Sequence, residues 1–210
     1  MALSDEIDLK EMERRALTAY HEDGLLDIFW GGYLLFLGLV VFTPMEYRLI
    51  VVMPTALGIL LYDRAKKRVT YPRLGYVKLT KEMEARVLRD TLIVIFVAWF
   101  VTLAGLFTNM GVPERASWLV LFLNRYNLLF QGGVLALIFL MLGRIMSISR
   151  LYHYSVISLL VFSAGYFYLD SPYIVSLQNL GVPCAIIGLI MVGIGASRLQ
   201  RFIGKYSKEA

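Results

Sequence analysis

Cysteine and histidine are scarce in this sequence of 210 residues. The single cysteine, Cys184, cannot form an intramolecular disulfide and cannot supply a thiolate cluster for zinc or iron–sulfur. It lies in an apolar run, where cysteine behaves as a small hydrophobic residue. The two histidines, His21 and His153, are distant in sequence and form no helical H-x-x-x-H pair. We therefore expect no metal site and no cofactor.

Sequence signatures of catalysis are missing as well. The chain contains no phosphate-binding loop, nucleophile elbow, H-E-x-x-H pair or dinucleotide fingerprint. No closely spaced carboxylates suggest two-metal phosphoryl transfer, and serines such as Ser158 and Ser163 have no neighbouring base in sequence. The sequence therefore predicts no catalytic residue. A membrane enzyme assembled from residues distant in sequence is the alternative.

Charge is sparse, and long apolar stretches take its place. Charged residues make up 18% of the chain and hydrophobic residues 58%, whereas soluble domains carry about 25% charged residues. A helix that crosses a bilayer needs about 20 mostly apolar residues. Six stretches approach that length, at about 25–43, 49–62, 91–108, 127–143, 152–169 and 183–200. The sequence predicts an all-α polytopic membrane bundle with six transmembrane helices in a single domain, residues 1–210.

The basic residues indicate how this bundle is oriented. Eighteen of the 21 lysines and arginines lie before residue 25, in 63–90, between the fourth and fifth stretches, or after residue 197. With six spans, all of these segments fall on one side of the membrane. Short cytoplasmic loops carry the Lys/Arg excess, so we expect both termini in the cytoplasm and the protein in the cell membrane. No nucleic-acid-binding motif accompanies the charge, and we expect no nucleic-acid partner.

Two polar segments flank the first two spans. Residues 4–22 predict an amphipathic cytoplasmic helix before the first span, and 63–90 predict a basic cytoplasmic loop. In this loop, anionic lipid headgroups would attract each nearby cation by about 1 kcal/mol. The alternative is docking of a protein partner or of a ligand phosphate. The residues that we expect to contact headgroups or a partner are Arg64, Lys66, Lys67, Arg68, Arg73 and Lys78.

Glycines recur every seven residues in the first and the sixth span. Lipid gives helices little hydrophobic reason to associate, whereas small residues let their backbones approach and make van der Waals contact. We therefore expect the first and sixth spans to form the tight centre of the bundle. The same stripes could serve a homo-oligomer. The packing residues are Gly24, Gly31, Gly38, Gly181, Gly188 and Gly195.

Polar side chains at membrane depth are costly and are candidates for function. Asp27 lies one turn into the first span, on the cytoplasmic side, where we expect Arg144, Arg150 or His153 to meet it. A second group precedes or begins the fourth span on the outer side. The candidates for a polar cavity or pathway are Asp27, Asn124, Arg125, Asn127, Gln131 and His153.

Three functions follow as alternatives from these residues. The first is a small-solute transporter or channel-like protein with a polar cavity on the fourth span. The second is a non-catalytic accessory, assembly or sensing subunit that uses the basic loop 63–90. The third is a membrane enzyme that acts on lipid near the cytoplasmic interface.

Overall fold

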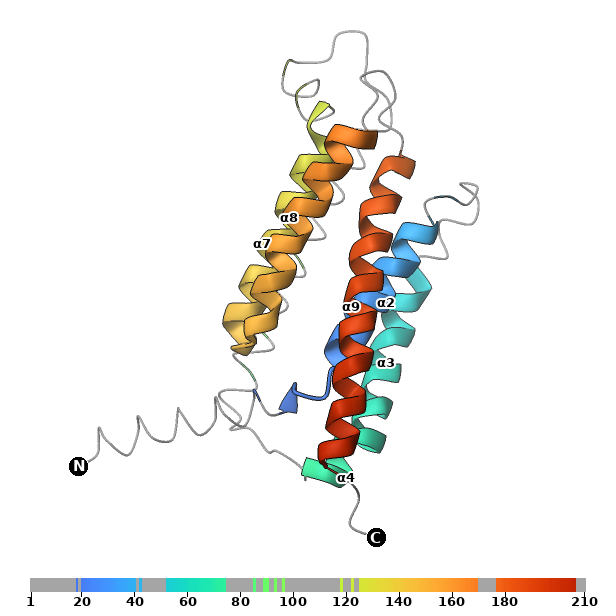
Figure 1. Cartoon of the computed structure of the whole chain (residues 1–210), viewed down its shortest axis with the longest axis vertical. Helices are drawn as coiled ribbons and strands as arrows, with labels where there is room; N and C mark the ends of the chain where they lie inside the picture. Colours follow the sequence, from blue (N-terminus) through green and yellow to red (C-terminus); the bar gives the residue numbers. More distant parts are fainter. Residues whose placement is uncertain are drawn as a thin grey trace, which may run out of the picture.

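All regular structure in the described part of the chain is helical (Figure 1). The computed structural model describes residues 20–40, 52–74, 125–169 and 177–206, with isolated positions at 18, 42, 85, 89, 90, 93, 96, 118 and 122. The helices are α2 (Leu25–Val40), α3 (Val52–Val69), α4 (Tyr71–Leu74), α7 (Asn127–Met146), α8 (Ser149–Leu169) and α9 (Leu177–Lys205). The predicted all-α class is thereby confirmed.

The long helices run side by side along the long axis of the molecule (Figure 1). The most extensive contact among them joins α2 to α9, and the next joins α7 to α8. Smaller contacts link α8 to α9 and α2 to α3. An apolar core unites four of the helices, with Leu34 of α2, Phe139 of α7, Leu151 of α8 and Met191 of α9 among its members.

A two-residue connection makes α7 and α8 an antiparallel hairpin. Ser147 adopts the left-handed conformation at φ 56°, ψ 36°, and the N–H of Ile148 donates to the carbonyl of Gly143 at 3.0 Å. This arrangement satisfies a carbonyl that would otherwise lack a partner at the helix end. The chain then turns directly into α8. Arg150, near the start of α8, therefore lies at the same end of the bundle as Arg144 in the last turn of α7.

The glycine stripes lie at the contact between α2 and α9. A Cβ on Gly31 would come within 2.8 Å of the carbonyl oxygen of Gly188, and one on Gly38 within 2.6 Å of that of Gly181. Gly24, whose φ is +73°, faces Gly195 in the same way. The two stripes therefore meet in antiparallel register, and backbone packs directly on backbone.

Helix boundaries differ from the expected spans. Two helices, Asn127–Met146 and Leu180–Lys205, are long and apolar enough to cross a membrane, whereas α2 is shorter at 16 residues. The described helices therefore do not establish six membrane crossings. Most of the third expected span and of the N-terminal helix 4–22 lies outside the described residues.

The basic loop expected at 63–90 is partly helix. Residues 63–69 continue α3, and Tyr71–Leu74 forms α4 after a turn at Thr70. The residues DRAKKR include good helix formers, and an ion pair of 2.6 Å joins Asp63 to Lys67 across one helical turn. The apolar stretch in the sequence ends at residue 62, whereas the helix continues to Val69.

Candidate functional site

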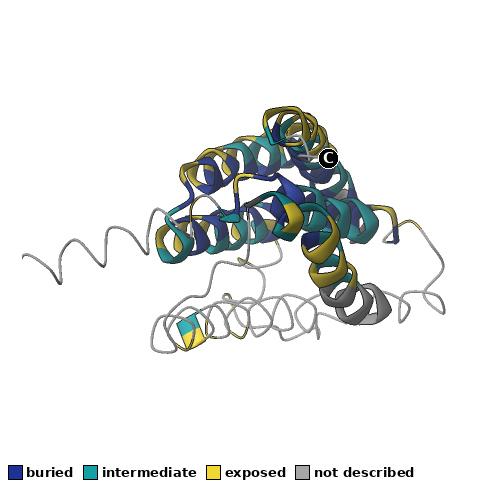
Figure 2. Ribbon diagram, turned by 90° about the horizontal axis from the view of Figure 1, so that it is seen from below, coloured by how far each residue is buried: buried dark blue, intermediate teal, exposed yellow. Residues whose placement is uncertain are grey.

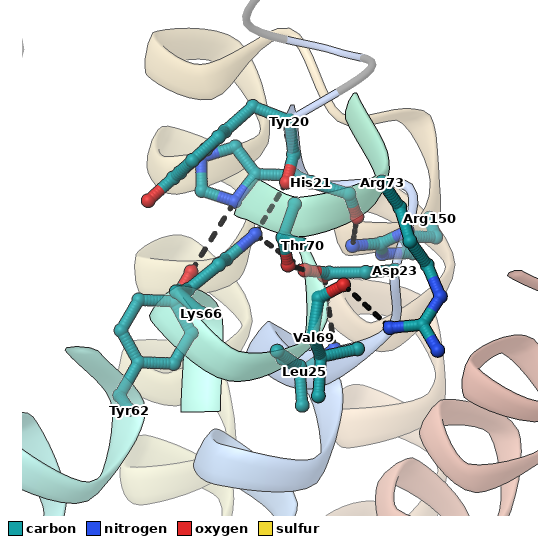
Figure 3. Close-up of polar contacts among 10 residues, drawn as sticks. All are labelled: Tyr20, His21, Asp23, Leu25, Tyr62, Lys66, Val69, Thr70, Arg73 and Arg150. Atoms are coloured by element: carbon teal, nitrogen blue, oxygen red, sulfur yellow. Dashed lines mark hydrogen bonds and ion pairs between the residues drawn. The ribbon is translucent and has the colours of Figure 1, made fainter. Parts of the chain in front are cut away.

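The turn before α2 is buried where α3 and α8 meet it (Figure 3). Asp23 is fully buried, and its Oδ1 accepts a hydrogen bond of 3.1 Å from the N–H of Leu25 in the first turn of α2. The positive end of the helix dipole also favours a carboxylate there. Gly24 supplies the left-handed residue that lets the chain enter α2 against Gly195.

Lys66 of α3 binds this turn through its ammonium group. Its Nζ lies 2.7 Å from Asp23 Oδ2 and donates to the carbonyl of Tyr20, and it sits 3.9 Å from the centre of the Tyr20 ring. The hydroxyl of Thr70, in the turn that follows α3, donates to the same Asp23 oxygen. Burial lowers the pKa of Lys66 and the nearby Asp23 charge opposes that effect. Asp23 and Lys66 form a fully buried and well-satisfied ion pair.

Arg150 of α8 binds the same turn from the other side. Its guanidinium donates to the carbonyl of His21, and its Nε lies 3.0 Å from Asp27 Oδ1. This second contact has the distance of an ion pair, but its atoms are not aligned as a hydrogen bond. Asp27 is fully buried, and neither of its carboxylate oxygens has a hydrogen-bond partner among the described residues.

His21 stays neutral between these charged side chains. Burial, followed by the positive charges of Lys66 and Arg150, lowers its pKa from 6.5 to about 3. The hydroxyl of Tyr62 lies 3.5 Å from its Nδ1. We call the four residues Asp23, Asp27, Lys66 and Arg150 the charge cluster; its two carboxylates and two cations balance.

A polar stripe continues from the charge cluster along α8. Arg150, Tyr154 and Ser158 are spaced by four residues and lie on one helical face. Tyr154 and Ser158 are at most 1% exposed, and neither hydroxyl has a hydrogen-bond partner among the described residues. At about 1.5 Å per residue the stripe covers about 12 Å.

Phe162 ends the polar stripe at the next position of the same face. It is buried, and its Cβ lies where a side chain on Gly132 of α7 would stand. One turn further, the ring of Tyr166 stacks on Tyr126 at 5.9 Å, close to the start of α7. The buried face of α8 therefore changes from polar to apolar at Phe162.

The structure separates the predicted pathway residues. Asp27 meets Arg150, one of its three expected partners, while Arg144 and His153 are exposed. On α7, Asn127 is buried and Gln131 half-buried, whereas Arg125, which precedes α7, is exposed with its guanidinium 6.0 Å from the centre of the Tyr126 ring. Asn124 lies outside the described residues.

The structure also separates the predicted docking residues into exposed ones and ones that are held by contacts within the protein. Arg64, Lys67 and Arg68 are exposed, as a headgroup contact requires. Lys66 is not available for docking, because its ammonium is buried against Asp23. Arg73 donates to the carbonyls of Val69 and Tyr206, and Lys78 lies outside the described residues.

Sequence reasoning missed Asp23, Lys66 as a buried partner, Thr70, Tyr154 and Ser158. A signal was present, since polar residues recur at four-residue spacing in 23 and 27, 66 and 70, and 150, 154 and 158. Each series lies at the predicted cytoplasmic end of an apolar stretch. A comparison with family models, curated proteins and solved structures finds no match to this chain.

Proposed function

We propose that the chain is a multi-pass integral membrane protein with six crossings and both termini in the cytoplasm. In the two helices long enough to cross a membrane, only 33% and 39% of the residues in the most apolar window are buried within the molecule. The core helix of a soluble protein is mostly buried, so the exposure of these helices favours lipid contact.

The distribution of side chains supports the same proposal. Large apolar residues are exposed on the outer faces of three helices, as in Leu137 of α7, Leu160 of α8 and Leu189 of α9, whereas the four residues of the charge cluster are buried. Seen along the bundle, the buried faces turn inward and the exposed faces outward (Figure 2). Water favours the opposite arrangement and lipid favours this one.

Four segments that the charge rule assigns to the cytoplasm come together at one end. The turn at 20–24 contacts Lys66 and Arg150, and Arg73 donates to the carbonyl of Tyr206. Lys205 lies 3.5 Å from Glu22. This meeting supports an orientation with that end in the cytoplasm.

Within the bilayer, we propose transport of a small polar solute, with its site at the charge cluster and the hydroxyls of Tyr154 and Ser158. The observation that carries this proposal is the buried ion pair of Asp27 and Arg150, which lies at the end of a helix face that carries the buried hydroxyls of Tyr154 and Ser158. Ionisable groups buried in a membrane bundle are candidates for solute or ion pathways. Phe162 then forms an apolar barrier that separates this site from Asn127 and Gln131.

Flux into liposomes tests the proposal. Purified protein is reconstituted, and entry of a panel of small neutral, anionic and cationic solutes is followed by stopped-flow light scattering. We expect the protein to speed entry of at least one solute, Arg150→Gln to reduce that flux, and Phe162→Ala to increase it by removing the barrier. Phe202→Ala is the control, because Phe202 is similarly buried but belongs to α9, where its ring packs against Tyr206. If no solute enters faster than through empty liposomes, transport is wrong.

A second candidate is a non-catalytic accessory subunit. It is favoured by the apolar core, in which Phe139, Leu142 and Ile187 are at most 2% exposed, and by the exposed Arg64, Lys67 and Arg68 at the cytoplasmic end. These three cations would attract anionic lipid headgroups. Added anionic lipid should then raise the unfolding temperature of the detergent-solubilised protein, and neutralising all three should reduce that rise. An equal rise with zwitterionic lipid would argue for a protein partner instead.

A further inference from the structure

At the end of the bundle where the charge cluster lies, most of the described cations are held by contacts within the protein. Lys66 and Arg150 are buried in the cluster, and Arg73 donates to two backbone carbonyls. Lys67 and Lys205 are paired with acidic side chains. The cations at this end that are exposed and have no ion-pair partner among the described residues are all arginines. We call them the arginine collar; they are Arg64 and Arg68 of α3, Arg144 of α7 and Arg201 of α9.

The collar lies near one level along the bundle. Helices α3, α7 and α9 all run toward this end (Figure 1). The two arginines of α3 lie two residues before and two residues after Lys66, which contacts the turn before α2. Gly195 of α9 faces the same turn, and Arg201 follows it by six residues, or about 9 Å along the helix. Arg144 lies in the last turn of α7 at this end. Arginine side chains are long enough to reach a single layer of headgroups from these positions.

Exposed apolar residues precede the collar on the same helix faces. Leu61 lies one turn before the first arginine of α3, Met141 one turn before the arginine of α7, and Ile194 two turns before that of α9. Residues three, four or seven positions apart share one face of an α-helix. On each of the three helices the surface therefore changes from apolar to cationic toward the same end. A phospholipid presents its acyl chains and its phosphate in that order.

The chemistry and the distribution of the collar favour a lipid phosphate over an acidic protein. A planar guanidinium donates two parallel hydrogen bonds to one phosphate group, whereas a lysine ammonium is a compact point charge. The collar is also spread over the bundle, since α3 packs on α2 whereas α7 packs on α8. Lipid surrounds the whole perimeter of a bundle and covers the apolar residues as well. An acidic protein segment would complement the charges but leave those apolar residues uncovered.

We propose that the arginine collar binds the phosphate groups of anionic phospholipids, whose acyl chains lie on the exposed apolar residues of the same helices. This inference rests on the proposed membrane location, and it extends the lipid contact from α3 to cations on three helices. Lys67 is left out of the collar, because Asp63 lies 2.6 Å from its ammonium group and offsets its charge. A zwitterionic lipid carries the same phosphate, but its choline ammonium offsets the charge that the arginines attract.

Electron paramagnetic resonance of spin-labelled lipids tests this inference. The purified full-length protein is reconstituted in phosphatidylcholine bilayers that contain traces of spin-labelled phosphatidylglycerol or spin-labelled phosphatidylcholine. The motionally restricted fraction of each label measures its contact with the protein. We expect phosphatidylglycerol to associate about two- to fivefold more strongly than phosphatidylcholine, and we expect this preference to fall in about 1 M salt.

Substitution of the collar should remove the preference without removing the lipid contact. In the variant that combines Arg64→Gln, Arg68→Gln, Arg144→Gln and Arg201→Gln, the two labels should associate almost equally. The substituted side chains are exposed, so phosphatidylcholine should be restricted as in the wild type, which verifies that the variant is folded in the bilayer. If it is not, Arg64→Gln with Arg68→Gln, and Arg144→Gln alone, should each lower the preference.

The matched control is Asp63→Asn made together with Lys67→Gln. It removes one charge of each sign from the same stretch of α3, so the wild-type preference should persist.

The outcomes separate this inference from the proposed function. Equal restriction of both labels by the wild type would retain the membrane location, overturn the collar and favour an acidic protein partner for these arginines. An unchanged preference in the combined arginine variant would overturn the collar as well. So would loss of the wild-type preference on adding glycerol phosphate, because a free phosphate would then suffice. Absence of any restricted lipid would overturn the membrane location and the collar together.

Discussion

At the scale of residues, side chains that are adjacent in the sequence differ sharply in burial. Lys66 and Lys67 are adjacent and identical, yet Lys66 is fully buried against Asp23 and Lys67 is 60% exposed beside Asp63. A buried pair cannot lose one partner without stranding the other charge, whereas an exposed pair is screened by water. The stability of this end of the bundle therefore depends on individual atoms and not on the density of charge.

Lys66→Ala should destabilise the protein far more than Lys67→Ala. The first change leaves Asp23 buried without its cation, at a cost of about 3–5 kcal/mol, while the second removes an exposed pair worth less than about 1 kcal/mol. Thermal unfolding of the two variants in the same detergent compares them directly. Equal shifts would mean that Lys66 is not buried with Asp23.

His21 should make stability depend on pH. Its pKa falls from 6.5 in the unfolded chain to about 3 in the fold, so between these values the unfolded chain binds the extra proton. The stabilisation from neutral His21 is therefore complete above pH 6.5 and is lost as the pH falls toward 3, by about 1.4 kcal/mol per pH unit at most.

Unfolding measured across this range should have a shallower slope in His21→Gln than in the wild type. His153→Gln is the matched control, because the chain has only these two histidines and the side chain of His153 is exposed. A wild-type slope in His21→Gln would show that His21 is not held neutral by burial.

At the scale of elements, α2 and α9 depend on the absence of side chains. Gly31 faces the backbone of α9, where a Cβ would lie 2.7 Å from the N of Val192, while Gly32 beside it has open space. Two adjacent glycines thus have different roles, because one points at a neighbouring backbone and the other away from it.

Gly31→Ala should lower the unfolding temperature and Gly32→Ala should not. Forcing a methyl group into the contact costs about 1–3 kcal/mol, since the neighbour is backbone and cannot rotate away. At position 32, alanine improves helix propensity by up to about 1 kcal/mol. If both substitutions were neutral, α2 and α9 would not pack as closely as described.

At the scale of the whole molecule, the arrangement collects charge at one end and leaves apolar surface along the sides. The ends of α3 and α9 and the start of α2 lie together at the lower end of the bundle in Figure 1. The far end of α8, with Tyr168 88% exposed, lies opposite. A bilayer would be crossed between these ends.

Single cysteines test this topology in a Cys184→Ala background. We expect Lys67→Cys and Lys205→Cys to react with a membrane-impermeant maleimide only after the cell membrane is permeabilised, and Tyr168→Cys to react in intact cells. All three side chains are exposed, so access is governed by the membrane and not by the fold. Labelling of Lys67→Cys and Lys205→Cys from opposite sides would contradict six crossings.

The sequence by itself determined the helical class, the apolar stretches, the glycine periods and the clustering of cations in four segments. These are local properties, because the composition and spacing along one helix define them. The charge rule also narrowed the expected partners of Asp27 to Arg144, Arg150 and His153, because it placed all four residues at one end of the bundle.

Only the tertiary structure decided which polar groups meet. Asp23 and Lys66 are 43 positions apart, and Asp27 and Arg150 are 123 apart, so no spacing along the chain relates them. Whether a lysine such as Lys66 faces lipid headgroups or a buried carboxylate depends on how its helix is rotated against its neighbours. Packing sets that rotation, and with it which side chains at the end of the bundle could form a site.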